Sequence, residues 1–537
     1  MLLIIRLSFV SPNYQNFIIL TLLNQSRTPY IDAMPTSKVY SAIPYGFDGH
    51  LVAVECDMNR GLPSFSIVGL PNRAIDESRQ RIRSAITNSL FSFPPHKITV
   101  NLAPAELHKT GTQLDLPIAI SILSSSNQLL QSDLDNKAFI GELALSGEIR
   151  PVKGIINALE TFRRNGIKQI YIPAANSPQA QLVAHDLNIY PVKTLRELWL
   201  SLKSIANILP LKENVKNTEK DKHEHVILDD IVGQSQAKRA IIIAMAGHHN
   251  LLLSGPPGVG KTMLAQAARA LLPPPTLQEL IDITKIHSLI SADAPLQTTR
   301  PFQSPHHTIS LSNFLGSSLT LQPGELSLAH NGILFMDEFP EFSRQIIEAL
   351  RTPLETKQIS LNHLGRKIIY PSDFILIAAM NPCPCGYLGS SHKACTCSPS
   401  AIQNYRKKLS GPIVDRIDMT LMLNPIETSV LLKNTTFSTV EHASAKKQIG
   451  IALRCQAKRY HTSTIHNATI GSAQLVRVAT ISPSAKLLLD DAADKLHLSA
   501  RSYFKTIKVA QTIADLEDSA HIDEPHIAES LQYRAQF

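Results

Sequence analysis

The hydrophobic positions of this chain follow two alternating periods, one typical of strands and one typical of helices. Over residues 38–209, the stretches HLVAVECDM, SFSIVGL, KITVNLAP and KQIYIP alternate or run apolar in the manner of strands. Between them, the segment 72–89 carries Ile75, Ile82 and Ile86 at helical spacing, and LDLPIAISILSSS reads as an apolar helix. Strands and helices that alternate in this way predict a compact α/β unit.

A hairpin and a linker complete this first part of the chain. The string AFIGELALSGEIRPV predicts two strands that turn at Ser146–Gly147. The string KENVKNTEKDKHEH, within residues 211–225, is charged and poor in apolar residues, so it predicts a flexible linker.

A second α/β pattern follows the linker, and after it the apolar residues keep only the helical period. Helices are predicted over SVLLKN, residues 429–434, and over residues 443–460, 483–495, 500–518 and 524–533. The predicted domain boundaries are 34–210 for the first unit, 211–225 for the linker, 226–425 for the second unit and 426–537 for a helical domain.

The first residues of the chain do not share these patterns. They are apolar in two pieces that Arg6 and Pro12 interrupt, and no run in the sequence reaches the roughly 18 apolar residues of a membrane helix. They also lack the basic start, continuous apolar core and cleavage site of a signal peptide. Because Met34 stands directly before the first orderly pattern, we expect residues 1–33 to be a non-native or disordered extension; a genuine additional segment is the alternative.

Composition is that of a globular protein. Hydrophobic residues make up 44% and charged residues 18% of the chain, which is enough apolar material for several cores. A net charge of +8 favours polyanionic partners only slightly. Four of the six cysteines cluster between Cys383 and Cys397, which indicates a metal site in a reducing compartment such as the cytoplasm rather than a disulfide framework.

The string GPPGVGKT fits the phosphate-binding pattern G-x-x-x-x-G-K-[ST], with an apolar strand before it and a helix-forming segment after it. Its residues are Gly255, Pro256, Pro257, Gly258, Val259, Gly260, Lys261 and Thr262. Glycines let backbone N–H groups turn toward phosphates, and the helix N-terminus adds positive potential. We predict that Lys261 reaches the β- and γ-phosphates of ATP and that Thr262 binds Mg²⁺.

A second string, ILFMDE, reads as an apolar strand that ends in two carboxylates. We predict that Asp337 binds the magnesium shell and that Glu338 polarises the attacking water. Together the two strings make a chance glycine-rich turn a poor explanation of the first one. The chain is therefore predicted to hydrolyse ATP with the help of magnesium.

Five further positions are weaker candidates, each with an ordinary structural alternative. Asn381 ends the strand FILIAAMNP and suits either orientation of the water or the cap of a turn. Arg416 lies between two aspartates and suits either neutralisation of a γ-phosphate, often in a neighbouring subunit, or a surface ion pair. Ile231 and Val232 suit either an adenine pocket or the core, and Arg501 alone carries no signal.

Two close pairs of cysteines form the candidate metal site. Cys383 and Cys385 make one C-x-C pair, and Cys395 and Cys397 make the other. Two pairs of thiolates can converge on one tetrahedral zinc, although their spacing is tighter than the usual C-x-x-C. His392 is able to replace one ligand. We predict zinc here, and unligated loop thiols are the alternative.

The order of several strings is that of an AAA+ ATPase, and their wording resembles its magnesium-chelatase-like branch. The strings are DDIVGQ, GPPGVGKT, ILFMDE, AAMNP, GPIVDRID and SARSYFKTIKVAQTIADLE. GLPSFSIVGLP, FPPHKITVNLAPAE and LDLPIAISIL are similar to strings of the competence-associated ComM/YifB family. The resemblance covers about residues 39–532. It implies an α/β chain with a Lon-protease-like N-terminal α+β domain, an AAA+ P-loop α/β domain with a cysteine-rich insertion over 383–397, and a C-terminal helical lid.

The resemblance also implies roles for the weaker candidates. Asn381 looks like a first sensor, Arg416 like an arginine finger that acts on a neighbour's ATP, and Arg501 like a second sensor that reaches the γ-phosphate from the lid. A finger that acts on a neighbour implies a homo-hexameric ring. In the Lon-like domain, Gln113 and Ile156 stand near the expected serine and lysine, so peptidase activity is not expected.

The function that the resemblance implies is an ATP-dependent DNA motor, or helicase, that promotes branch migration of incoming DNA in natural transformation. Its implied partners are single-stranded and branched DNA, with no membrane. QISLNHLGRKIIYPSDF reads as a hairpin whose Arg366 and Lys367 suit phosphate contacts, and a solvated surface hairpin is the alternative. Two other functions stay open: a magnesium chelatase motor subunit, and a nucleotide-switched protein remodeller.

Overall fold

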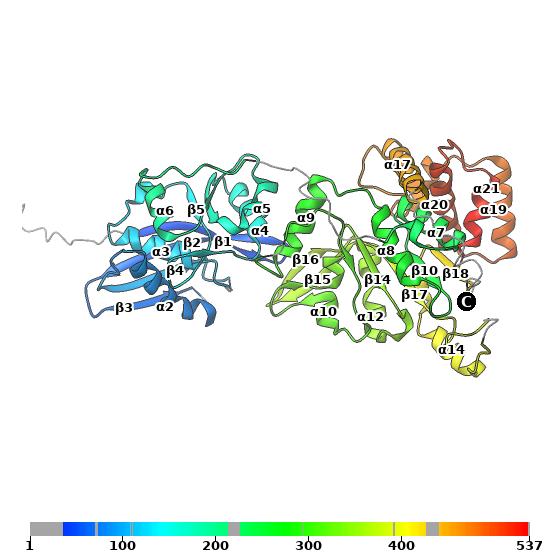
Figure 1. Ribbon diagram of the computed structural model, residues 1–537, viewed down its shortest axis with the longest axis horizontal. Helices are drawn as coiled ribbons and strands as arrows, with labels where there is room; N and C mark the ends of the chain where they lie inside the picture. Colours follow the sequence, from blue (N-terminus) through cyan, green and yellow to red (C-terminus); the bar gives the residue numbers. More distant parts are fainter. Residues whose placement is uncertain are drawn as a thin grey trace, which may run out of the picture.

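The computed structural model describes residues 36–69, 73–107, 109, 111–212, 226–293, 295–389, 393–425 and 440–534. Three units follow one another in chain order along the long axis of the molecule: a first sheet with its helices, a second sheet with its helices, and a bundle of helices (Figure 1). The predicted extension over 1–33 lies outside the described residues, as does almost all of the predicted linker.

Seven strands form the first sheet in the order β3-β4-β2-β1-β5-β8-β9. Their bounds are β1 Ser37–Tyr45, β2 Asp48–Asn59, β3 Ser64–Val68, β4 Lys97–Ala103, β5 Lys137–Phe139, β8 Gln169–Pro173 and β9 Asn188–Val192. β2 pairs antiparallel with β1 and with β4, and the other neighbours are parallel. The tight turn between β1 and β2 needs Gly46, whose φ of +65° favours glycine.

Helices cover both faces of this sheet. They are α2 Arg73–Asn88, α3 Asp115–Ser125, α4 Ile155–Arg164 and α6 Leu195–Leu202. The alternation of side chains along β1 sets the arrangement, because Val39 and Ile43 join the core under α2, α3 and α6, whereas Ala42 joins the core under α4. The helix predicted over 72–89 is α2 and is confirmed.

The hairpin predicted to turn at Ser146–Gly147 is also confirmed. It consists of β6 (Glu142–Leu143) and β7 (Ile149–Arg150), which pair antiparallel. Gly147 has a φ of +87°, so the residue type that signalled the turn also supplies its backbone conformation.

Five parallel strands form the second sheet in the order β11-β14-β17-β10-β18. Their bounds are β10 Leu251–Ser254, β11 Phe302–Gln303, β14 Ile333–Met336, β17 Ile375–Met380 and β18 Met419–Met422. β10, β14 and β17 are buried along their whole length, as their unbroken apolar sequences require when helices cover both faces. Because the strands are parallel, their carboxyl ends meet at one edge of the sheet.

Helices on the two faces of this sheet carry its functional segments. They are α7 Ser235–Gly247, α8 Lys261–Leu271, α9 Leu277–Ser288, α12 Arg344–Ala349 and α13 Arg351–Thr356. Successive side chains of β10 pack on opposite faces of the sheet. Leu251 and Leu253 join the core with α7 and α8, whereas Leu252 joins the core with α12 and α13.

Two hairpins stand side by side on this domain. They are β12 Gly316–Ser317 with β13 Gln322–Pro323, and β15 Gln358–His363 with β16 Arg366–Pro371. The Nδ1 atom of His363 lies 2.5 Å from the carbonyl oxygen of Ser318, which joins the two hairpins near their tips. The hairpin predicted around Arg366 and Lys367 is thereby confirmed as a structural element.

The C-terminal domain is a bundle of helices. They are α17 Val440–Tyr460, α18 Ser472–Val478, α19 Pro483–Lys495, α20 Ala500–Leu516 and α21 Glu524–Gln532. The four helices predicted from residue 443 onward are confirmed, with small differences at their ends, and α18 was not predicted. The helix predicted at SVLLKN lies outside the described residues. Serine hydroxyls cap α19 and α20, because Ser482 accepts a hydrogen bond from the N–H of Ala485 and Ser499 from that of Ser502.

The first two domains share a fixed contact between α4 and α9. Lys285 of α9 is almost fully buried, lies 2.6 Å from the carboxylate of Glu160 and stacks over the ring of Phe47. The N–H of Gly154 also donates to the carbonyl of Ser288. Burial of an ammonium group requires such a partner, so this contact is specific. Every helix among the described residues is too short or too polar to span a bilayer.

Candidate nucleotide site

The predicted phosphate loop lies between β10 and α8, at the carboxyl edge of the second sheet. β10 ends at Ser254 and α8 begins at Lys261, so the first turn of α8 points its N–H groups toward the loop. Gly258 and Gly260 have φ values of +81° and +90°, while a side chain at either position would meet no atom within 4 Å. Backbone conformation, not space, therefore requires glycine at both positions.

Lys261 is held at the centre of this loop. Its Nζ atom donates to the carbonyls of Gly255 at 2.7 Å and Pro256 at 3.1 Å, and to Oδ1 of Asn381 at 3.0 Å. Burial lowers the pKa of Lys261, and the carboxylates of Asp337 and Glu338 act in the opposite direction. The structure thus brings Asn381, at the end of β17, to the phosphate loop.

The oxygen atoms predicted to bind magnesium also meet at this edge. The hydroxyl of Thr262 donates to Oδ2 of Asp337 at 3.2 Å, and the N–H of Glu338 donates to Oδ1 of Asp337 at 2.9 Å. A hydroxyl beside a carboxylate fits Mg²⁺, which prefers oxygen ligands. Glu338 has a φ of +50° and a half-exposed side chain, which leaves its carboxylate free to meet water.

One neighbour of Glu338 was not linked to it from the sequence. Nδ1 of His307 lies 3.8 Å from Oε2 of Glu338, and the ring of His307 packs against that of His306. From the sequence, the adjacent histidines of PHHTIS suit a structural or a pore-loop role, and only the fold brings one of them to the candidate base.

The predicted adenine contacts are not gathered into an open pocket. Ile231 is 5% exposed and belongs to the apolar core, and Val232 is half-buried. A cavity of about 310 Å³ beside the phosphate loop is lined by other residues, among them Gln236, Ser254 and Tyr533. The role of Ile231 and Val232 in adenine binding stays a prediction.

Arg416 and Arg501 lie together at the opposite edge of the sheet. Arg416 stands just before β18, where the N–H of Asp418 donates to the carbonyl of Asn250, the residue before β10. β10 spans 4 residues, roughly 13 Å, between this edge and the phosphate loop. Both guanidinium groups bind Glu355. The fold therefore places the two arginines beside each other and away from Lys261 of the same chain.

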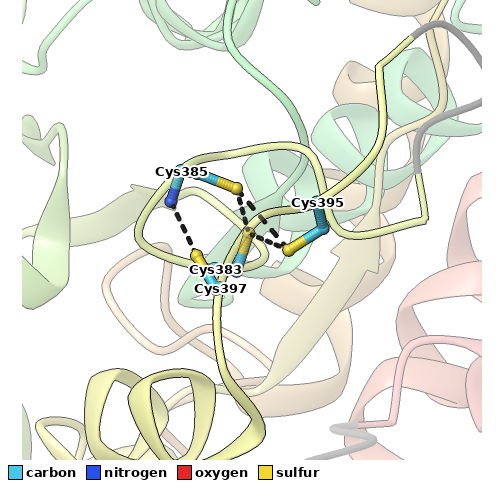
Figure 2. Close-up of side chains that lie close together, drawn as sticks. All are labelled: Cys383, Cys385, Cys395 and Cys397. Carbon is cyan, nitrogen blue, oxygen red and sulfur yellow. Dashed lines mark hydrogen bonds between the residues drawn. The ribbon is translucent and has the colours of Figure 1, made fainter.

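The four clustered cysteines converge on one point (Figure 2). All their sulfur atoms lie within 4.8 Å of one another, with 3.4 Å between Cys383 and Cys385 and 3.6 Å between Cys383 and Cys395. A tetrahedral zinc with Zn–S bonds of about 2.3 Å separates its sulfurs by about 3.8 Å, so the donor set fits this metal. None of the thiols is in a disulfide, and His392 lies outside the described residues.

The loop that carries Cys383 and Cys385 touches the phosphate loop through Gly386. Gly386, with a φ of +83°, packs so closely on Pro257 that an added Cβ would lie 2.8 Å from its ring. The insertion leaves β17 directly after Asn381 and leads to α14 (Pro399–Lys407), which projects from the sheet (Figure 1). The cluster is therefore built onto the nucleotide site.

Comparison with known proteins agrees with this geometry. Residues 227–431 match the family described as magnesium chelatase, subunit ChlI; residues 54–176 match subunit ChlI of Mg-chelatase, and residues 440–534 match its C-terminal region. The chain is 39% identical over 506 residues to competence protein ComM of Haemophilus influenzae, which covers 94% of this chain and 98% of that protein. The chain belongs to the ComM/YifB family of magnesium-chelatase-like AAA+ proteins.

Other relatives within and beyond this family match too. YifB of Escherichia coli, an uncharacterized protein, is 38% identical over 504 residues, 94% of this chain and 97% of YifB. The magnesium-chelatase 38 kDa subunit of Cereibacter sphaeroides is 26% identical over 174 residues, 28% of this chain and 51% of that subunit. A Lon protease of Buchnera aphidicola is 27% identical over 173 residues, 30% of this chain and 22% of the protease.

The ComM/YifB assignment fits the three units of the fold. A Lon-like α+β domain precedes an AAA+ P-loop domain and a helical lid. In the Lon-like domain, Gln113 is buried and Ile156 lies in the apolar core under α4. As a AAA+ protein of the magnesium-chelatase type, the chain carries the residues of an ATPase that uses ATP and magnesium.

Proposed function

We propose that this chain is an ATP-dependent DNA motor, a homo-hexameric ring that drives branch migration when incoming DNA recombines during natural transformation. The observation that carries the proposal is likeness to a competence protein over 94% of the chain; the phosphate loop, Asn381 and Asp337, which meet at one edge of the sheet, support it. ATP hydrolysis with and without single-stranded and four-way-junction DNA tests it. Stimulation by DNA is expected, and hydrolysis indifferent to every DNA form would contradict it.

Hydrolysis at this site follows from the positions of five side chains. Lys261 gives up its loop carbonyls for the β- and γ-phosphates, which offer its ammonium group stronger acceptors. Thr262 and Asp337 would hold Mg²⁺, which supplies charge neutralisation at the phosphates. Glu338 takes the proton of the attacking water, and Asn381 orients that water from the tip of β17.

Arg416 and Arg501 act on the ATP of a neighbouring copy in this proposal. Their position at the edge opposite the phosphate loop supports it, because the length of β10 separates them from this chain's own phosphate loop. A head-to-tail contact that brings this edge to the next copy's phosphate loop closes a ring when the rotation allows it. The hexamer is therefore an expectation from the family, supported by the separation of the two edges.

The two joined hairpins are the proposed contact with DNA. Leu319 and Leu364 at their tips are 86% and 74% exposed, and Arg366 and Lys367 are exposed next to one tip. Cationic side chains suit the phosphates of single-stranded DNA, and exposed leucines suit insertion between bases at a branch. Arg366 also lies 3.5 Å from Glu106 of the Lon-like domain, which connects that domain to the hairpin.

Zinc is the metal that we propose for the cysteine cluster. The convergence of four reduced sulfurs supports it. The contact of Gly386, in the same loop, with Pro257 indicates its use, since a metal would stiffen the loop between Asn381 and α14. Reduced thiolates suit a reducing compartment, so we expect the protein in the cytoplasm.

A magnesium chelatase motor subunit is the second candidate. The match to the 38 kDa subunit favours it, but that match covers only 28% of this chain. A chelatase motor and a protein remodeller both predict hydrolysis stimulated by a protein partner. Stimulation by DNA alone separates the DNA motor from both.

A further inference from the structure

A charged cavity of about 550 Å³ surrounds Arg416 and Arg501. Its charged lining residues are Glu355, Lys357, Asp415, Arg416, Asp418, Arg501, Lys505 and Lys508. Five of these side chains are basic and three are acidic, so the cavity has the excess positive charge that suits an anion. It lies at the edge of the sheet opposite this chain's own phosphate loop, so an anion held by another molecule can reach it.

Glu355, near the end of α13, binds both arginines. Its Oε1 atom accepts a hydrogen bond from Nη2 of Arg416 at 2.6 Å and from Nη2 of Arg501 at 3.1 Å. These bonds, the one from Arg416 above all, lower the pKa of Glu355, which is therefore ionised at neutral pH. One carboxylate oxygen thus joins two guanidinium groups.

The three members of this cluster are not held with equal strength. Arg416 has a 12% exposed side chain and also donates to the carbonyls of Arg351 at 3.1 Å and Pro412 at 2.6 Å. Arg501 and Glu355 are 43% and 47% exposed. The pair between Arg501 and Glu355 is exposed and therefore weak, whereas backbone carbonyls also hold Arg416, so Glu355 can leave while Arg416 stays in position.

We propose that Glu355 occupies the place that the γ-phosphate of a nucleoside triphosphate takes when a second, nucleotide-loaded copy of this chain docks on this face. A γ-phosphate offers several oxygens and more negative charge than a carboxylate to the same two guanidinium groups. Docking displaces Glu355 toward solvent, since two anions cannot share the arginines. The proposal rests on the ring proposed above and adds a competitor that weakens assembly until nucleotide is bound.

Glu355→Gln tests this competition, because it keeps the size of the side chain and an oxygen for the arginines but removes the charge. We expect half-maximal ATP hydrolysis, and half-maximal assembly with a slowly hydrolysed ATP analogue, at protein concentrations about three- to tenfold lower than for the wild type. An unchanged or higher concentration would overturn the proposal. Glu348→Gln is the matched control, because Glu348 pairs with Arg351 at 2.8 Å outside the cavity.

These measurements are made without DNA, so they do not depend on whether the ring moves on DNA. A wild type whose hydrolysis per chain is independent of protein concentration would contradict the ring, and the role of Glu355 with it. If hydrolysis per chain depends on protein concentration in the wild type, and Glu355→Gln shows the same dependence, only the role of Glu355 is contradicted. If Glu355→Gln does not fold, Glu355→Asp replaces it, because the shorter side chain draws the carboxylate away from the arginines. This variant must also lower the protein concentration at half-maximal hydrolysis.

Discussion

The ammonium group of Lys261 lies 3.0 Å from the side-chain oxygen of Asn381, although Lys261 begins α8 and Asn381 follows β17. This hydrogen bond ties the candidate sensor to the phosphate loop. In the proposed mechanism Lys261 exchanges this partner for phosphate oxygens, which releases Asn381 to orient water.

Replacement of Asn381 by alanine is expected to lower kcat for ATP hydrolysis about a hundredfold, with a smaller effect on KM, because orientation of water matters in the transition state. Steady-state hydrolysis measures both constants. Asn404→Ala, an exposed asparagine on α14, is the control. A kcat within twofold of the wild type would assign Asn381 to the turn before Pro382 instead.

Mixed rings should recover activity that neither parent has. Lys261→Ala removes the phosphate ligand, and Arg416→Ala removes the arginine that we assign to the neighbour. In an equal mixture, about one quarter of the interfaces combine an intact loop with an intact arginine, so about that share of wild-type hydrolysis is expected. A double variant mixed with Arg416→Ala forms no complete interface and is the control; equal rates in both mixtures would argue for action within one chain.

We expect the exposed hairpin of β15 and β16 to affect DNA binding but not ATP hydrolysis in the absence of DNA. Arg366→Glu reverses a charge next to the exposed tip, so we expect a lower DNA affinity, a shallower salt dependence and weaker stimulation of ATP hydrolysis. Arg477→Glu on α18 makes the same charge change at another exposed position. Equal DNA affinity of the two variants would show that the hairpin is a solvated surface element that does not contact DNA.

The cysteine cluster should carry an equimolar amount of zinc. Cys383→Ser with Cys395→Ser removes two of four ligands, so elemental analysis of the purified variant should show the metal lost. ATP hydrolysis should fall as well, because the freed loop packs on Pro257. Cys455→Ser leaves the cluster intact and is the control. A wild type free of bound metal would favour unligated thiols.

Acid should destabilise the chain through two buried histidines. Burial lowers the pKa of His330 and of His466 to about 4, whereas both titrate near 6.5 when unfolded. Between pH 6.5 and pH 4 the unfolded state binds more protons than the folded state. The free energy of unfolding therefore falls as the pH drops from 6.5 toward 4, by about 3 kcal/mol for each histidine. Urea midpoints at pH 7 and pH 5 measure the loss, and His330→Gln should reduce it. An unchanged difference would exclude His330.

The sequence was sufficient for features that depend on neighbouring residues along the chain. The phosphate loop, the carboxylates after β14 and the capped helices α19 and α20 all carry their signals within a few residues. α18 was missed because SAQLVRV is short and gives barely one helical repeat of apolar residues.

Contacts between distant segments could not be predicted in the same way. Glu355 shows no sequence signal, since a lone glutamate at a helix end is usually solvated, and its partners Arg416 and Arg501 follow much later in the chain. Their separation from Lys261 depends on which end of β10 each segment meets, and the parallel pairing of β18 with β10 decides that for Arg416.

Branch migration of a four-way junction is the sharpest test of the proposed DNA motor. Labelled junctions are incubated with the wild type or with Lys261→Ala, with ATP and with a slowly hydrolysed analogue, and the conversion to duplex products is followed. We predict conversion only with the wild type and ATP. Hydrolysis of ATP by the wild type without conversion of any junction would contradict the DNA motor.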